Sequence, residues 1–348
     1  MPFYFHVPAE GELPMMNFYT KIPFTEDKFA EVLQAKPGNR AVVHHVALSM
    51  KHPPEGQRVE NGVLVDAKTG IPIPQERQRG GDVGEDNTPE ARAAAAARAQ
   101  EQARAAEQQQ LVIYAPGWVI ETYRPGIGKR IPSDGRYIDF NQHYQMTGKP
   151  EIDRSSVGFW FQKVPMTHEL KQTSISATHI VEGQELVADE KAIAAAKKRS
   201  TGGGGPQRAL LPNIPAYAEN WGIVGVTAFT DDVSVYSFTP HMHLRGKDMK
   251  YVAVYPDGRE DTVLSVPKYD FNWQVVYTPE TPLRLPAGSK LVVYSHFDNS
   301  TKNKYNPAPD KEVFWSEQSW DEMFFGFIKY TVDKDDLSKQ SKVDQQQQ

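Results

Sequence analysis

The sequence contains no cysteine. Its absence excludes disulfide bridges and thiolate metal ligands, so any bound metal must be held by histidine, methionine, aspartate or glutamate. Long apolar runs are also lacking, and we expect no segment that spans a bilayer. The first residues lack the charged region and the apolar region of a signal peptide, which predicts either a protein not exported by that route or a piece of a longer chain.

Positive charge does not dominate the chain. The net charge is −5 and the isoelectric point is near 6.1, with no long basic run. We therefore expect neither nucleic acid nor an anionic membrane surface as a partner. Gly126 and Gly128 lack the spacing and the following helix of a phosphate-binding loop, which argues against a nucleotide site.

Turn-forming residues, by contrast, are abundant. The 348 residues include 26 prolines and 25 glycines, and 11% of the side chains are aromatic, a composition typical of many short strands. We therefore predict an all-β protein, and its length suits two domains. A short helix is predicted to end at about Gln34, because Thr25 is a suitable N-cap and Glu26 and Asp27 follow it in the first turn.

Two alanine-rich segments interrupt the β pattern. The first, at about 75–110, is predicted to be a solvated helix, because Thr88 can cap it and proline follows. The second, at about 188–207, joins an alanine- and lysine-rich helix to a glycine linker. The predicted domains are residues 13–168 and 169–333, each carrying one insertion, followed by a disordered tail at 334–348.

The ten histidines are unevenly distributed, because four of them fall in two tight pairs. His241 and His243 follow a β-like run, and residues two apart on a strand project from the same face. The pair can therefore offer two imidazoles to one ion, and imidazole suits copper, zinc, iron and nickel alike. A pair of surface or hydrogen-bonded histidines is the alternative, and the pair alone does not decide between the two.

His44 and His45 are adjacent in the sequence. Neighbouring residues on a regular strand face opposite ways, so both can bind one ion only if the strand contains a bulge or a twist. Without one, one of the two is an ordinary core or surface residue. His143 lies on the polar face of a predicted strand at 136–146 and is a candidate third ligand. Met323 precedes several aromatic residues, and by these surroundings alone it would be assigned to the core.

Four motifs follow one another along the chain: His44-His45, Gln142-His143-Tyr144, His241-Met242-His243-Leu244-x-Gly246-Lys247 and Asp321-Glu322-Met323. This order resembles the copper type II, ascorbate-dependent monooxygenases, the group of peptidylglycine α-hydroxylating and dopamine β-monooxygenases, and more closely their bacterial-type members. The resemblance covers the chain from about Leu13 to Tyr330, apart from the two insertions.

The resemblance implies two tandem jelly-roll β-sandwich domains, each with one copper ion. It implies an electron-transfer copper held by His44, His45 and His143. It also implies a second copper, where oxygen binds and hydrogen is abstracted, with the catalytic ligands His241, His243 and Met323. The thioether of the last ligand suits Cu(I), the state that meets dioxygen.

The function implied by the resemblance is hydroxylation of a C–H bond of a small organic substrate. Copper and O2 would be required, and ascorbate or another one-electron reductant would supply the electrons. The implied location is the periplasm or the extracellular space. The implied partners are the substrate, dioxygen and an upstream domain or a protein electron donor.

The sequence departs from the amidating members of that family at two positions. Those enzymes anchor a peptide carboxylate with an arginine and a tyrosine, where this chain has Thr239 and Phe327. A glycine-extended peptide is therefore not the expected substrate. Three aromatic residues with equal spacing, Tyr269, Phe271 and Trp273, are expected to share one strand face, either lining an apolar pocket or packing in the core.

Two other functions compete with the monooxygenase. A non-catalytic copper-binding or assembly module could use the same scaffold with its alanine-rich insertions as partner surfaces. A zinc hydrolase is less favoured, because no general-base carboxylate accompanies either histidine group at a recognisable spacing.

Overall fold

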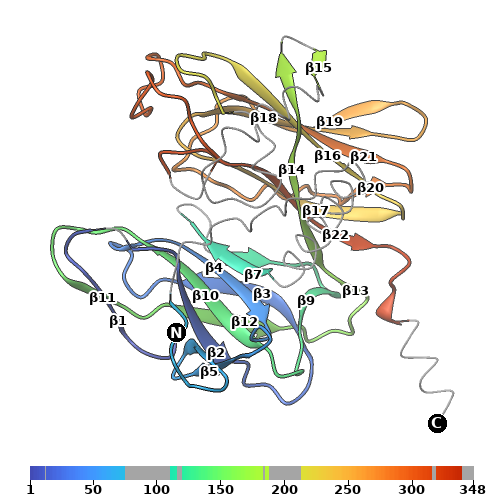
Figure 1. Ribbon diagram of the computed structural model, residues 1–348. Coiled ribbons are helices and arrows are strands. Elements are labelled where there is room, and N and C mark those ends of the chain that lie inside the picture. The colour runs from blue at the N-terminus through green and yellow to red at the C-terminus, as the bar shows by residue number, and fades with distance from the viewer. Residues whose placement is uncertain are drawn as a thin grey trace. The chain divides into compact units, whose positions relative to one another are not determined.

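The computed structural model describes residues 1–11, 13–74, 110–115, 120–182, 185–187, 213–315 and 319–338. These residues form strands β1 to β22 (Figure 1), which confirms the all-β class predicted from the composition. They fall into two compact units: unit 1 contains the described residues up to 171 together with 335–338, and unit 2 contains those from 172 to 334. Both predicted alanine-rich helices lie outside the described residues.

Unit 1 is built from two main sheets and two small ladders. The first sheet has the order β2-β10-β4-β7, with strands at Met16–Lys21, Tyr137–Tyr144, Val43–Lys51 and Gln110–Tyr114. The second has the order β12-β3-β9-β13, at Ser156–Phe161, Lys28–Lys36, Ile127–Ile131 and His168–Glu169, and β8 (Ile120–Thr122) pairs with β3. The ladders join β1 (Phe5–Val7) to β11 (Glu151–Asp153) and β5 (Gln57–Glu60) to β6 (Val63–Asp66).

The core of unit 1 lies between its two main sheets, as in a β-sandwich. Leu48 and Phe140 from the first sheet belong to the same buried cluster as Ala30 and Leu33 from the second. Because side chains alternate along a strand, the odd-numbered residues of β10 project from the opposite face of the first sheet. That outer face carries His143.

The short helix predicted to end at about Gln34 is wrong, because Lys28–Lys36 forms strand β3. This strand pairs with β12, β8 and β9, and the ladder bonds outweigh a weak local helix signal. Asp27 does not begin a helix. Its carboxylate accepts a hydrogen bond from the Ser133 N–H at 2.8 Å and one from the Arg130 guanidinium at 2.7 Å.

Unit 2 contains one large sheet, with the order β19-β18-β21-β16-β14-β22-β17-β20 and with β15 paired to β14. In the order of the chain, the strands are β14 (Lys171–Glu182), β15 (Glu185–Val187), β16 (Trp221–Ala228), β17 (Val233–Met242), β18 (Gly246–Val254), β19 (Glu260–Val266), β20 (Leu283–Leu285), β21 (Lys290–Phe297) and β22 (Phe324–Val332).

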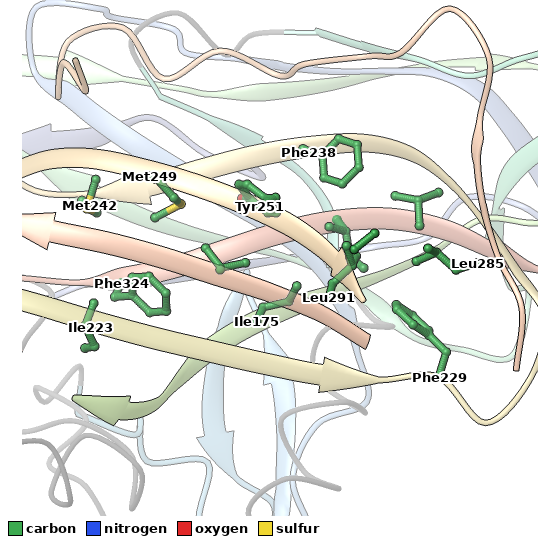
Figure 2. Close-up of a cluster of buried hydrophobic side chains, with 14 of the residues drawn as sticks. Ile175, Ile223, Phe229, Phe238, Met242, Met249, Tyr251, Leu285, Leu291 and Phe324 are labelled. Atoms are coloured by element: carbon green, nitrogen blue, oxygen red, sulfur yellow. The ribbon is translucent and has the colours of Figure 1, made fainter. Parts of the chain in front are cut away.

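The sheet of unit 2 folds over a large apolar core, and a smaller cluster of Val224, Val252 and Val292 lies apart from it. Phe238 and Phe324, from β17 and β22, belong to the same buried cluster as Tyr251 from β18 (Figure 2). At Gly326 of β22 the layers approach closely, because a methyl group there would lie 2.9 Å from Cγ2 of Val293 on β21. The two halves of the sheet therefore pack face to face, and the predicted sandwich packing is confirmed.

Residues 334–338 were predicted to belong to a disordered tail, but they make defined contacts. The Lys171 ammonium pairs with Asp335 at 2.7 Å, and the N–H of Leu337 donates to the carbonyl of Thr167 at 2.8 Å. Ordered chain therefore extends past residue 334. In the part of the chain that the structure describes, no helix combines the length and the apolar character needed to cross a membrane.

Candidate metal centres

The first candidate centre, the three-histidine site, consists of His44, His45 and His143 in unit 1. His45 is the cross-strand partner of His143, whereas the next pair joins Val43 to Tyr144, so His44 is an extra residue in β4. This is a β-bulge, in which two residues of one strand oppose one residue of the other. It supplies the irregularity that the adjacent histidines require, and it leaves both of them on the outer face of the sheet.

The bulge brings the three imidazoles together. One ring nitrogen from each residue lies within 4.8 Å of one from each of the others. The Nδ1 atoms of His44 and His45 are 3.2 Å apart, and the ring of His143 is centred 5.2 Å and 4.9 Å from their rings. A metal bound at about 2.0 Å from each nitrogen would keep the nitrogens about 3 to 4 Å apart. Small side-chain adjustments therefore suffice for three nitrogens to share one ion.

The protonation of this site also suits a metal. Burial lowers the pKa of the His44 imidazole, and burial together with the charge of His44 lowers the pKa of His143 to about 4. The rings of His44 and His143 are therefore neutral near pH 7, which is the form that binds metals. The Nδ1 atom of His143 is buried and has no hydrogen-bond partner among the described residues. Such an atom is unusual in a folded protein, and a metal ion would satisfy it.

A buried carboxylate lies behind the three-histidine site, on the core side of β10. Asp153 is 1% exposed, and its Oδ2 accepts hydrogen bonds from the Tyr144 hydroxyl and the Ser155 hydroxyl, both at 3.0 Å. Its Oδ1 accepts from the N–H of Asn39 at 2.9 Å. The carbonyl of Asn39 in turn accepts from the N–H of Val43 at 3.1 Å. Asp153 therefore ties the turn before His44 to the strand that carries His143.

The second candidate centre, the histidine–methionine site, consists of His241, His243 and Met323 in unit 2. β17 and β22 pair in the register that joins His241 to Phe325 and Met242 to Phe324. His243 and Met323 are the residues that come next after this last pair, so a continued register would set them opposite each other on one face. The two imidazole rings are perpendicular, with centres 5.4 Å apart.

Hydrogen bonds orient both imidazoles of this site. Gln274 Nε2 donates to the carbonyl of Phe271 at 3.0 Å, so its Oε1 is the atom that lies 2.7 Å from His241 Nδ1. His243 Nδ1 lies 3.3 Å from the carbonyl oxygen of Asp321. Because both oxygens only accept, each Nδ1 carries the proton and each Nε2 is the nitrogen suited to a metal. Metal-binding histidines are commonly held in this way.

Met323 does not belong to the core of unit 2. The neighbouring Phe324 is part of the buried cluster, whereas Met323 is half-buried and lies on the other side of the chain. The core contains Met242 and Met249 instead, both 0% exposed, and the sulfur of Met242 accepts a hydrogen bond from the Ser295 hydroxyl. Because side chains alternate along a strand, Met323 falls on the same side as Phe325, whose ring stacks on His241. Two imidazoles and a thioether are a ligand set that suits a soft metal ion such as Cu(I).

Aromatic rings surround the histidine pair. The ring of Phe325 stacks on His241 at 6.2 Å between centres, and Phe327 lies at the same distance. Phe271 meets His243 edge to face at 5.8 Å. Phe327 pairs with Thr239 across the ladder, so the two departures from the amidating enzymes lie side by side on the two strands.

The expectation that three equally spaced aromatics share a strand face is wrong, because residues 267–276 form no strand. The Tyr269 hydroxyl donates to the carbonyl of Met242 at 2.7 Å and accepts from its N–H at 3.0 Å. Trp273 is 68% exposed. Of the three, Phe271 is the one whose ring meets a candidate ligand, His243.

Sequence reasoning missed two residues of the second site. Gln274, which orients His241, lies 33 positions further along the chain, and nothing in its neighbourhood marks it. Glu322 stands inside one of the four motifs, but its role was not inferred. A charged residue directly before a ligand and inside a strongly apolar segment was the available signal, because such residues are buried only when they are bonded.

Comparisons with known proteins identify no family. No family model matches the sequence, and no curated protein matches it. Among solved structures, an uncharacterized protein from Listeria monocytogenes EGD-e is similar over 57% of this chain, with 15% identity and a TM-score of 0.17, and the chain spans 14% of that protein's length. The VP2 subviral particle of infectious bursal disease virus is similar over 94% of this chain and 74% of its own, with 9% identity and a TM-score of 0.20. Likenesses this weak carry no information on function.

Proposed function

We propose that this chain is a copper- and O2-dependent monooxygenase that hydroxylates a C–H bond of a small organic substrate. The observation that supports it most strongly is the convergence of His44, His45 and His143 at a bulge between β4 and β10. The four-motif resemblance to the copper type II, ascorbate-dependent monooxygenases adds the second site. Copper bound at the two sites would supply one-electron redox chemistry and a place for dioxygen.

The reaction sets requirements that the two sites can divide between them. Hydroxylation by dioxygen places one oxygen atom in the substrate and one in water, and it consumes two electrons and two protons. Three neutral imidazoles can hold either oxidation state of copper, so the three-histidine site suits electron storage. The thioether of Met323 favours Cu(I), so the histidine–methionine site suits the reaction with dioxygen. Ascorbate or another one-electron reductant would restore both ions.

The side chains around the second site have separate tasks in this proposal. Gln274 and the carbonyl of Asp321 hold the imidazoles of His241 and His243 in the tautomer that presents Nε2. Phe325 and Phe327 lie against the ring of His241 and would exclude water on that side. Their apolar rings, and the absence of an anchoring arginine at Thr239, favour a substrate without a carboxylate near the reacting carbon.

The test is a measurement of copper content and of oxygen consumption. After copper loading and dialysis, we expect two copper ions per chain in the wild type and one in the Met323→Ala variant under reducing conditions. A screen of small organic compounds should then find at least one that the protein hydroxylates, and that compound should raise the rate of ascorbate-driven oxygen uptake. Binding of two coppers without any substrate-dependent oxygen uptake would contradict the proposal.

A second candidate function is a copper-binding or assembly module without catalysis. Its support is that the three-histidine site is complete within unit 1 and needs no residue of unit 2. In that case one copper per chain would bind, loss of Met323 would change nothing, and ascorbate would drive no substrate-dependent oxygen uptake. The same two measurements therefore separate the candidates.

A further inference from the structure

Glu322 connects the two segments that carry the ligands of the histidine–methionine site. It is 0% exposed, and its Oε2 accepts hydrogen bonds from the backbone N–H of His243 at 2.8 Å and of Met323 at 3.3 Å. Its Oε1 accepts from the N–H of Arg245 at 2.6 Å. Two of these three donors belong to candidate ligands. One buried side chain therefore holds both ligand segments by their backbones.

The Glu322 carboxylate lies directly beyond the end of the β17–β22 ladder. β17 ends at Met242 and β22 begins at Phe324, and their ladder ends with the pair that these residues form. His243 and Met323 lie one residue beyond the ladder, so strand hydrogen bonds no longer fix their spacing. Glu322 bridges this gap.

Arg245 reinforces the bridge from the other side. This residue is 2% exposed, its Nε donates to Asn299 Oδ1 at 2.8 Å, and its Nη1 donates to the carbonyl of Trp320 at 2.7 Å. The guanidinium therefore holds the turn that leads into Glu322, while the backbone of the same residue holds the carboxylate. Both ends of the short segment before Met323 are fixed.

We propose that Glu322 is a positioning residue that sets the Met323 thioether beside the imidazoles of His241 and His243 before a metal binds. This inference rests on the proposed function, because it takes Met323 to be a ligand. Residues that orient metal ligands through such contacts change metal affinity by about 10- to 100-fold when they are replaced. The metal preference should change as well, because the displaced group is the soft ligand.

Substitution by glutamine breaks this arrangement in a defined way. A carboxylate offers two acceptor oxygens, and Glu322 uses both of them, whereas an amide offers one oxygen and a donor NH2 group. The Glu322→Gln side chain can therefore serve either Arg245 or the pair of ligand N–H groups, but not all three. Glu322→Asp keeps both oxygens and is shorter by one methylene, so it should retain part of the effect.

The experiment measures Cu(I) affinity on the full chain by competition with a chromophoric chelator, and it records the copper–sulfur component of the X-ray absorption spectrum. The copper–sulfur component reports on Met323 alone among the proposed ligands, because the three-histidine site supplies nitrogen only. The variants are Glu322→Gln, Met323→Ala and the double variant. Glu219→Gln is the matched control, since the side chain of Glu219 is 57% exposed.

We expect Glu322→Gln to weaken Cu(I) binding at this site by about 10- to 100-fold and to diminish the copper–sulfur component, with Glu219→Gln unchanged. In the Met323→Ala background the glutamine substitution should add no further loss. Independent, additive losses would overturn the positioning role while leaving Met323 as a ligand. An unaltered spectrum in Met323→Ala would overturn both this role and the proposed function.

Because Glu322 is buried, its replacement can prevent folding, so the experiment includes a second variant. If Glu322→Gln does not fold, Glu322→Asp takes its place in the same cycle, with an intermediate loss of affinity expected. A copper–sulfur component as strong in Glu322→Asp as in the wild type, with wild-type Cu(I) affinity, would then count against the positioning role. Copper bound at the three-histidine site serves as an internal control and should be unchanged in every variant.

Discussion

Replacement of His143 by phenylalanine should have opposite effects on stability without and with metal. In the metal-free protein, His143 keeps a buried ring nitrogen that no described residue satisfies. A phenyl ring has a similar shape and carries no polar atom, so His143→Phe removes that penalty. The same change removes one of three ligands, so the variant should lose the stabilisation that metal binding gives the wild type.

The two effects have comparable size. An unsatisfied buried polar group costs about 1 to 3 kcal/mol, so the metal-free variant should be more stable than the wild type by about that amount. A ligand present at a hundred times its Kd stabilises the folded state by about 2.7 kcal/mol, provided that it binds the folded state alone. With metal in excess, the wild type should therefore equal or exceed the variant. Adding metal should therefore remove or reverse the stability advantage that the variant has over the wild type in the metal-free state.

The assay is urea unfolding, once with EDTA and once with excess Cu(II). Unfolding is monitored by hydrogen exchange of the backbone amides in β4 and β10. This readout reports on unit 1 by itself, so unfolding of unit 2 does not obscure it. His52→Phe is the control, because the side chain of His52 is 54% exposed in the same unit. If His143→Phe were less stable than the wild type in EDTA, or if metal stabilised both proteins equally, the site would not be a metal centre of this design.

Three further predictions concern the stability of unit 2. Each is tested by the free energy of unfolding in urea, with tryptophan fluorescence as the signal. Tyr251→Phe should stabilise the unit by about 1 kcal/mol, because the Tyr251 hydroxyl is buried and has no hydrogen-bond partner among the described residues; a loss of stability would reveal a partner. Gly326→Ala should destabilise it by about 1 to 3 kcal/mol, because the added methyl would lie 2.9 Å from Val293 and 3.2 Å from both Cε1 and the hydroxyl of Tyr251. The loss should be slightly smaller in the Tyr251→Phe background, which removes the hydroxyl but keeps Cε1. Burial lowers the pKa of Lys329 from 10.5 to about 7, so the unfolded chain binds more protons than the folded chain between these values and stability should rise with pH across that range. Lys329→Met should flatten this rise, which is about 5 kcal/mol at most, and an unchanged pH profile would show that the amine is not desolvated.

The three-histidine site was predicted as far as local pattern allows. Alternation along 136–146 placed His143 on a polar face, and the structure has it there. The sequence could require a bulge between His44 and His45 but could not show that one exists, because a bulge depends on how the partner strand is paired. The role of Asp153 was out of reach for the same reason, since its contacts to Asn39 and Tyr144 join segments that meet only in the fold.

The fold shows the same division between local and non-local information. The all-β class followed from turn formers spread along the whole chain, because each of them acts locally. The helix near Gln34 was wrong because its signal was also local, while the outcome was decided by pairing with three other strands. Phe271 was expected on a strand, but its segment is fixed by contacts of Tyr269 and Gln274 with β17, which no spacing rule contains.

Both candidate centres use a buried carboxylate that touches backbone and not metal. Asp153 joins the turn before His44 to β10, and Glu322 joins His243 to Met323. Burying a carboxylate has a desolvation cost, and burial raises the pKa of Glu322, while three N–H groups and the charge of Arg245 oppose the shift. Apolar packing would stabilise the fold at least as well. A carboxylate can accept several N–H groups from different strands at once, and this capacity fixes distances between ligand-bearing segments in a way that apolar side chains cannot. The two carboxylates are therefore better explained by the geometry of the sites than by the stability of the sandwiches.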